Sequence, residues 1–459
     1  MALSNKEKYG YGIGAIGLDL SYGLVCSFFM NYATDSLHIS SVFMGVVLAA
    51  ARIWDGINDP IMGTIVNNTK NKWGRFRPWI LAGSIVNALV LWGMFTNPGL
   101  STAEGSNTGI YIYIAIAYIL WGMSYTLIDI PYWSFVPALT SDPKERNIVS
   151  SIPRFFSGMG QLLVAGLTPM LLPILGGGDK NNGYSKWALI LGVLFVLGTI
   201  VTVSTTREKI VPKTKENVSL KKAFKIIKEN DQLLVFILTA ITFNTGWYIT
   251  NGLAVYFFTY IAENLSYMTY FAVISGIGQA IGLFCLAPLS KKIGKHNVVK
   301  AAIITAIFGY VGMFFTAKLP SFNFILFAIF GCIGCMGIGC MFTAQTSMLA
   351  DIVDYGEYKL GERNDSIVFS MKSFLLKFAQ SIQALIIGFG LKLCNYQENV
   401  IPQPVGSKNG IVIMMFAIPP VLALLSLLIF IKKYKLHSTF AEEVTDHVLK
   451  RHETEGMNQ

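Results

Sequence analysis

Apolar runs dominate this chain and predict helices that cross a membrane. A helix needs roughly 20 predominantly apolar residues to span about 30 Å of hydrocarbon, and runs of this length recur along almost the whole sequence. Helices are expected because lipid offers backbone polar groups no outside partner. We place the spans at residues 11–33, 41–65, 79–97, 109–137, 147–174, 185–205, 232–260, 268–289, 298–317, 322–350, 366–394 and 409–431. The pattern predicts an all-α membrane protein with twelve transmembrane helices.

Positive charge in the connections orients these helices. Alternate connections carry lysine or arginine, namely Lys70, Lys72, Arg75 and Arg77, then Lys144 and Arg146, then Lys291, Lys292 and Lys295, then Lys359 and Arg363. The connections 97–108 and 261–267 carry neither residue. Because basic loops stay on the cytoplasmic side, we expect both termini in the cytoplasm.

The longest connection divides the spans six and six. Residues 207–231 are rich in lysine and are expected to form a cytoplasmic linker between an N-terminal half, 1–206, and a C-terminal half, 232–431. A short repeat supports this division, because Glu145-Arg146-Asn147 recurs as Glu362-Arg363-Asn364 at the corresponding place in the second half. Two six-helix halves with the substrate between them are the arrangement expected of major facilitator transporters.

The polar tail, residues 432–459, is predicted to be cytoplasmic and to contain a short amphipathic helix. Phe440, Val444 and Val448 are four residues apart and therefore share one helix face. We expect this face to lie on the carrier or on the lipid surface. A docking site for a cytoplasmic regulatory protein is the alternative.

Composition supports a bilayer protein and argues against other classes. Hydrophobic residues make up 53% of the chain and charged residues only 14%, against about 25% charged residues in soluble domains. The net charge is +10, but the basic residues lie in short loops rather than on one soluble face. We therefore expect membrane lipids, and no nucleic acid, among the partners.

The sequence lacks the residue groups that catalysis or ATP hydrolysis needs. It shows no nucleophile-base or metal-binding constellation and no Gly-x4-Gly-Lys-Ser/Thr loop. The histidines all fall in loops or the tail, so none is placed to relay protons across the membrane; they are His38, His296, His437, His447 and His452. We expect no enzyme activity, no cofactor and no ATP-driven transport.

A few ionisable residues lie deep within predicted spans, where each costs several kcal/mol and is by default functional. They are Asp19, Arg52, Asp55, Asp59, Asp129, Arg154 and Lys377. Their grouping along the helices indicates what they bind.

Asp55, Asn58 and Asp59 share one helix face and direct oxygen atoms to one place. Two carboxylates at this spacing repel each other unless a cation or a proton lies between them. Oxygen ligands suit a hard cation such as sodium. The alternative is structural, with both aspartates capped or paired by Arg52, although Arg52 can hardly reach both.

Lys377 lies about ten residues inside an otherwise neutral span and needs a negative partner. An aspartate of the second span could pair with it when the cation is absent. The alternative, a lysine that snorkels to the interface, is weaker at this depth.

Three charged side chains are candidates for a polyol site. Asp19, Asp129 and Arg154 can each hold two neighbouring hydroxyl groups. Trp133 lies one helical turn after Asp129 and could stack on the apolar face of a sugar ring, although tryptophan also belongs to interfacial aromatic belts.

These residues belong to longer motifs that resemble one transporter family. The motifs are Gly17-Leu18-Asp19, Arg52-Ile53-Trp54-Asp55-Gly56-Ile57-Asn58-Asp59-Pro60, Trp73-Gly74-Arg75-Phe76-Arg77-Pro78-Trp79, Trp121-Gly122-Met123-Ser124-Tyr125-Thr126, Asp129-Ile130-Pro131-Tyr132-Trp133, Pro153-Arg154-Phe155-Phe156 and Asp351-Ile352-Val353-Asp354-Tyr355-Gly356-Glu357-Tyr358. Over nearly its whole length the chain resembles the glycoside-pentoside-hexuronide:cation symporters, and most of all the melibiose carriers.

The resemblance implies a site for each of two cargoes. It implies a cation site of Asp55, Asn58, Asp59 and Thr126 with Lys377 close by, and a sugar site of Asp19, Asp129, Trp133 and Arg154 with Tyr125 and Ser373 at its edge. Melibiose carriers have a lysine where this chain has Leu18 and a tryptophan where it has Phe342, so the sugar can differ from melibiose.

The expected function is sodium-coupled uptake of a glycoside, with a galactoside as one candidate, through the cytoplasmic membrane of a bacterium. Protons or lithium could replace sodium as the transported ion. A proton-coupled carrier of a pentoside or hexuronide is the alternative, and a transporter-like ligand sensor is a further one.

Overall fold

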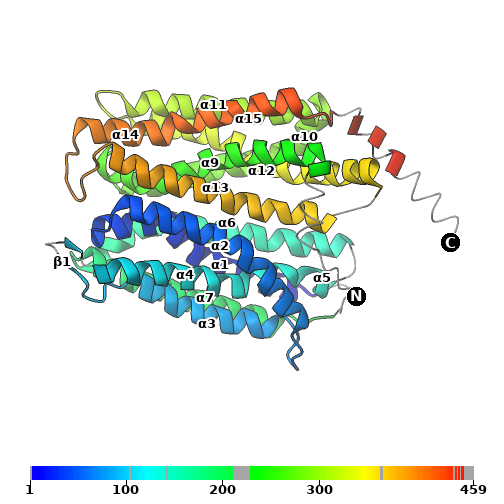
Figure 1. The fold of residues 1–459 in the computed structure, drawn as a ribbon, viewed down its shortest axis with the longest axis horizontal. Coiled ribbons are helices and arrows are strands. Elements are labelled where there is room, and N and C mark those ends of the chain that lie inside the picture. Colours follow the sequence, from blue (N-terminus) through cyan, green and yellow to red (C-terminus); the bar gives the residue numbers. More distant parts are fainter. Residues whose placement is uncertain are drawn as a thin grey trace. The chain divides into compact units, whose positions relative to one another are not determined.

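The computed structural model describes residues 3–102, 105–106, 108–140, 143–209, 228–361, 365–437 and 440–448, apart from 442 and 445. Its helices are α1 (Asn5–Asn31), α2 (Ser41–Asn68), α3 (Arg77–Met94), α4 (Thr108–Ser134), α5 (Val136–Leu139), α6 (Pro143–Gly176), α7 (Lys180–Thr205), α9 (Asp231–Tyr260), α10 (Ser266–Ile293), α11 (Lys295–Ala317), α12 (Phe324–Leu360), α13 (Asp365–Leu393), α14 (Val405–Phe416) and α15 (Ile418–Lys433), together with the π-helical turn η1 (Tyr32–Ser36) (Figure 1).

The helices confirm the all-α prediction, with one small exception. The connection before α4 contains a hairpin of two short antiparallel strands, β1 (Ser101–Thr102) and β2 (Gly105–Ser106). Within the described residues, 10 helical segments are long and apolar enough to cross a membrane. Helices α2 and α3 coincide with predicted spans but are not among these segments, and the charges of Arg52, Asp55 and Asp59 reduce the hydropathy of α2. The count of twelve and the orientation of the termini stay predictions.

Local sequence explains where several helices begin and end. Ser4 caps α1, because its side chain accepts a hydrogen bond from the Glu7 N–H while Glu7 reaches back to the Ser4 N–H. Asn323 caps α12 in the same manner through the Leu326 N–H. Helix α12 ends at Gly361, whose φ of 76° lies in the left-handed region that glycine adopts without strain.

The chain forms two compact units. The first contains residues 1–215, 251–272 and 384–410, and the second contains 216–250, 273–383 and 411–459. Each unit is described by itself below. The predicted halves, 1–206 and 232–431, stay a prediction.

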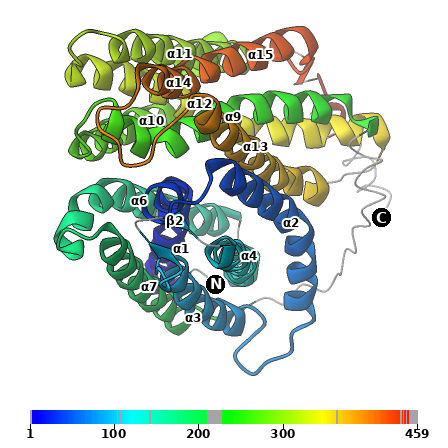
Figure 2. The ribbon, with the colours of Figure 1, turned by 60° about the vertical axis from the view of Figure 1, so that its left-hand side comes forward.

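Helix α1 lies in the middle of the first unit and packs on α6 and α7, while α4 packs on α2 and α3. Figure 2 looks nearly along α4 and shows these neighbours around it. Tyr11 of α1 and Tyr132 of α4 stack with ring centroids 4.5 Å apart, and each hydroxyl donates to the other residue's backbone carbonyl. Glycine lets α1 approach closely, because a Cβ on Gly17 would lie 2.8 Å from the Phe195 ring of α7.

The buried carboxylate of Asp35 joins the end of α1 to later segments of the first unit through hydrogen bonds. Asp35, in the π-helical turn, is 4% exposed. It accepts hydrogen bonds from the hydroxyls of Tyr260 and Tyr396, the latter at 2.7 Å, and from Asn31 at 2.9 Å. Asn399 donates to its backbone carbonyl at 2.5 Å. The sequence did not mark Asp35, because it stands at the polar end of a span, where carboxylates are common.

The second unit depends on close helix contacts at small residues. Helix α11 packs on α12 and α15. A Cβ on Gly309 of α11 would lie only 2.3 Å from Gly334 Cα of α12, so the two backbones touch. Small residues at such contacts are typical of membrane helices, which associate by packing rather than by the hydrophobic effect.

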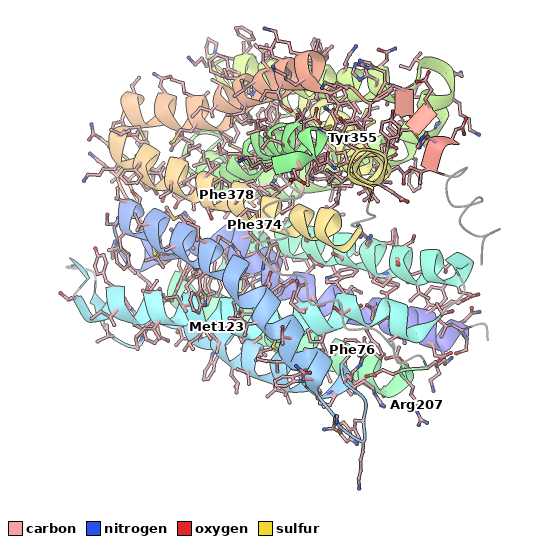
Figure 3. All side chains as sticks on the ribbon, turned by 45° about the vertical axis from the view of Figure 1, so that its right-hand side comes forward. Phe76, Met123, Arg207, Tyr355, Phe374 and Phe378 are labelled. Carbon is pink, nitrogen blue, oxygen red and sulfur yellow. The ribbon has the colours of Figure 1, made fainter. Side chains whose placement is uncertain are left out.

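The described part of the tail packs on the second unit through its apolar face, in line with the expectation that this face lies on the carrier. Val444 and Val448 are 2% and 4% exposed, and the Phe440 ring lies 6.4 Å from that of Tyr355. Tyr355, labelled in Figure 3, also donates from its hydroxyl to Asp231 Oδ1 at 2.8 Å. Lys359 pairs with the same carboxylate at 2.6 Å. The tail therefore lies beside a solvent-accessible charged cluster where α9 begins and α12 ends.

The contact of α11 with α12 gives a test of the packing. We expect Gly309→Ala to lower the free energy of unfolding by about 1–3 kcal/mol, because the methyl group overlaps backbone atoms that cannot yield. The control is Gly158→Ala in α6, where the new Cβ meets nothing within 4 Å. Thermal unfolding in detergent measures both variants. Equal melting temperatures for Gly309→Ala and the unchanged protein would contradict the described contact.

Candidate functional site

The predicted cation residues lie together where α2 faces α4. Asp59 Oδ1 accepts a hydrogen bond from Thr126 Oγ1 at 3.1 Å. One turn earlier, Asp55 faces Gly122, where a Cβ would lie 3.1 Å from Asp55 Oδ1. Asn58 is half-buried in the same turn of α2. Successive turns of α2 therefore face successive turns of α4, with Asp55 opposite Gly122 and Asp59 opposite Thr126. Two carboxylates and a hydroxyl lie close together as a result.

Arg52 supplies a positive charge at this face. Its Nη1 lies 3.1 Å from Asp55 Oδ2, and both side chains are less than a tenth exposed. The alternative that Arg52 pairs with an aspartate therefore holds for Asp55, because Arg52 balances the charge of that carboxylate. Within the described residues, no group of three or more His, Cys, Asp and Glu is arranged to hold a metal ion. The predicted set contains only two such residues, and its binding of sodium stays a prediction.

The expected polyol residues Asp129, Trp133 and Arg154 also come together. Trp133 Nε1 donates to Asp129 Oδ1 at 3.0 Å, as their spacing of one turn on α4 allows. The Arg154 guanidinium of α6 lies 5.9 Å from the centre of the Trp133 ring. A carboxylate, an indole and a guanidinium thus form one cluster, which we call the Asp129 cluster. It offers hydroxyl partners and a stacking surface.

Asp19 is held by α6, and the sequence did not reveal its partners. Gln161 Nε2 donates to Asp19 Oδ1 at 2.7 Å, and Ser157 Oγ donates to Asp19 Oδ2. Gly160 permits this approach, because a Cβ there would lie 2.8 Å from the Ile16 carbonyl oxygen. Ser157 and Gln161 follow Arg154 by three and seven residues, so they share its helix face. That spacing is the signal from which both could have been found.

Tyr125 connects the Asp129 cluster with Asp19. Its ring lies 5.5 Å from that of Tyr22 on α1 and 5.4 Å from that of Trp121 on α4. Tyr125 lies one turn before Asp129 on α4, and its neighbour Tyr22 lies one turn after Asp19 on α1. Its place at the edge of the sugar site stays a prediction.

The remaining predicted residues fall in α13, in the second unit. Lys377 is half-buried there, and the side chain of Ser373 lies outside the described part of the chain. Their roles stay predictions.

Of the two departures from melibiose carriers, Leu18 is 1% exposed in the apolar core of the first unit. Phe342 packs edge-on against Trp247 in the second unit, with ring centroids 6.3 Å apart.

Several proteins similar in sequence are named as sugar transporters or symporters. A family model described as MFS/sugar transport protein matches residues 10–438. A putative glycoside/cation symporter of Escherichia coli (strain K12) is 27% identical over 99% of this chain and 97% of its own length. The isoprimeverose transporter of Lactiplantibacillus pentosus is 28% identical over 86% and 81%. A lactose permease of Lactobacillus helveticus is 26% identical over 96% and 72%.

Solved structures agree on the fold. The crystal structure of nucleoside transporter NupG matches with a TM-score of 0.66 at 14% identity, over 94% of this chain and 100% of that chain. At this identity the likeness concerns the fold alone. The family match covers nearly the whole chain, and its members are membrane transporters rather than enzymes. This multi-pass membrane protein therefore belongs to the MFS/sugar transport protein family.

Proposed function

We propose that this protein is a secondary symporter that moves a sugar across the membrane together with a sodium ion, by alternating access. The observation that carries the proposal is one stripe of α4. Thr126, Asp129 and Trp133 follow one another at helical spacing, so a single helix serves the cation face at one end and the Asp129 cluster at the other. The relatives named as a glycoside/cation symporter, an isoprimeverose transporter and a lactose permease support the same assignment.

The cation part of the proposal rests on ligand chemistry. Carboxylate, amide and hydroxyl oxygens from Asp55, Asn58, Asp59 and Thr126 suit a hard monovalent ion. A sodium ion that enters a cell whose interior is about 100 mV negative gains roughly 2.3 kcal/mol, and a tenfold concentration gradient adds about 1.4 kcal/mol. The total of about 3.7 kcal/mol supports accumulation of several hundredfold at one-to-one coupling.

The sugar part rests on the pairing of charged groups with aromatic rings. Asp19, Asp129 and Arg154 each can hold hydroxyl groups in charge-assisted hydrogen bonds, while Trp133 offers a flat apolar surface. We propose a glycoside as the substrate class and the cytoplasmic membrane of a bacterium as the location. Lys377 is the proposed counter-charge of the aspartates, and Ser373 is proposed at the edge of the sugar site.

An uptake panel in proteoliposomes tests this function. We expect one of lactose, isoprimeverose and melibiose to accumulate when a sodium gradient is imposed, and not when the gradient is collapsed. If the sugar accumulates when a proton gradient is imposed without sodium, the coupling ion is the proton rather than sodium. Saturable binding without counterflow of any of these sugars would instead make the protein a sensor.

Replacing Asp55 or Asp59 with Cys tests the cation face. Each variant is expected to lose uphill accumulation, because ion binding needs both carboxylates. Sugar exchange is expected to persist in Asp59→Cys, which leaves the Arg52–Asp55 pair and the Asp129 cluster in place. The control is Asp179→Asn at the start of α7, where the side chain only accepts from the Asn181 N–H and asparagine can do the same. Normal accumulation in both cysteine variants would refute the cation assignment.

Asp129→Ala tests the hydroxyl partner. We expect sugar binding to weaken by about 2–3 kcal/mol, since a charged hydrogen-bond partner is lost and Trp133 Nε1 loses its acceptor. Trp133→Phe keeps a ring for stacking, so a smaller loss is expected. Calorimetric titration with the accumulated sugar measures both. An affinity that Asp129→Ala leaves unchanged rules out this carboxylate as a sugar ligand.

Gln161→Leu tests the support of Asp19. The variant removes the amide that donates to Asp19 Oδ1, and we expect sugar affinity to fall by about 5- to 30-fold, or 1–2 kcal/mol. Thermal stability is measured alongside, because Asp19 is only 7% exposed and would keep Ser157 as a hydrogen-bond donor. The neighbouring exposed Leu162→Ala serves as control on the same helix. Equal sugar affinities in both variants would show that Gln161 does not position Asp19 for binding.

A further inference from the structure

Arg52 lies in a cage of aromatic rings between its carboxylate and the sugar residues. Its guanidinium carbon is 5.6 Å from the ring centre of Tyr22, 5.6 Å from that of Trp121 and 5.9 Å from that of Tyr118. Contacts within about 6 Å of a ring centre are attractive cation–π interactions, and they strengthen when water is excluded. Asp55 and the three rings thus surround a guanidinium that is 7% exposed.

The cage gives the guanidinium a second favourable environment. A sodium ion bound by Asp55 and Asp59 would weaken the attraction between Asp55 and Arg52. A buried charge that loses its counter-charge is strongly destabilising, but here the rings offer replacement contacts without moving Arg52 into lipid. Cation binding is therefore expected to change the distance between the guanidinium and the rings, and with it the strength of the cation–π contacts.

Two rings of the cage continue toward the sugar residues. Tyr22 and Trp121 both contact Tyr125, with centroid separations of 5.5 Å and 5.4 Å. Trp121 is completely buried and fixed by a hydrogen bond from Nε1 to Ser21 Oγ at 3.1 Å. Tyr22 is only half-buried, and it lies three residues after Asp19 on the same face of α1. Tyr22 is therefore the less buried of these two rings and the one that shares a helix with a sugar carboxylate.

We propose that Tyr22 couples the two cargo sites, by transmitting the position of the Arg52 guanidinium to Tyr125 and Asp19. Sodium binding at Asp55 releases the guanidinium toward the rings, Tyr22 shifts with it, and the residues that hold the sugar take their binding arrangement. Tyr22 is thus a positioning residue and touches neither cargo. The proposal rests on the proposed function, because it explains how one cargo raises the affinity for the other.

The coupling factor is the quantity to measure. It is the ratio of the dissociation constants for the accumulated sugar without sodium and at saturating sodium, determined by calorimetry in wild type and variants. By linkage, the same factor describes the effect of sugar on sodium affinity. Tyr22→Leu removes the ring and keeps an apolar side chain, so we expect the factor to fall at least fivefold, toward one. Tyr22→Phe keeps the ring and is expected to retain the wild-type factor.

A matched control separates coupling from packing. Phe29 lies two turns after Tyr22 on the same face of α1 and is fully buried. Its ring contacts Phe95 and Tyr118, at 5.6 Å and 5.4 Å, and Tyr118 is the ring of the cage that has no part in the proposed route through Tyr22 to Tyr125. We expect Phe29→Leu to lower the melting temperature and to leave the coupling factor within twofold of wild type.

The outcomes distinguish the two proposals. A wild-type factor in Tyr22→Leu, or an equal loss in Tyr22→Leu and Phe29→Leu, overturns the role of Tyr22 while the symporter proposal stands. A loss in Tyr22→Phe as large as in Tyr22→Leu assigns the effect to the hydroxyl and also overturns it. A wild-type protein whose sugar affinity does not depend on sodium overturns both proposals, because there is then no coupling to transmit.

Discussion

The ion pair of Arg52 and Asp55 is the constraint on which the arrangement of α1, α2 and α4 depends. Both side chains are almost completely buried, and in a bundle surrounded by lipid each unpaired charge would cost several kcal/mol. The pair lies three residues apart on α2, so that helix can supply it alone. The aromatic residues that cover it come from α1 and α4. These two helices must therefore bring their aromatic side chains to the depth of the pair, and the packing of α4 on α2 also brings Thr126 to Asp59.

Glycine determines how closely helix backbones approach the buried carboxylates. Gly122 lets α4 pass beside Asp55, and Gly160 lets α6 pass beside α1 so that Ser157 and Gln161 reach Asp19. A side chain at either glycine would push a helix away and leave a carboxylate without its neighbour. In a membrane, where packing rather than the hydrophobic effect joins helices, the same small residues that permit association also place the polar groups.

Helical spacing made part of the site predictable from the sequence. The contact of Asp129 with Trp133 and the pairing of Arg52 with Asp55 both follow from positions three or four residues apart. Thr126 beside Asp59 came only from the family resemblance, because it joins two helices. The partners of Asp19 and the cluster around Asp35 were not found, since they depend on which helix faces meet. No local pattern specifies that choice, and a carboxylate at the end of a span, such as Asp35, looks like an ordinary loop residue.

Under the proposed function, Arg52 determines how tightly the site binds sodium. Without Arg52, two carboxylates one turn apart would repel each other whenever sodium was absent. With Arg52 against Asp55, the empty site already has a positive partner, so sodium competes with a guanidinium and binds less tightly than two bare carboxylates would bind it. Weaker binding favours release of the ion on the sodium-poor side. Part of the binding free energy of sodium is then used to displace the guanidinium. Only residues that contact the guanidinium can convert this displacement into a change in sugar affinity. Tyr22 and Trp121 are placed to do so because both also contact Tyr125.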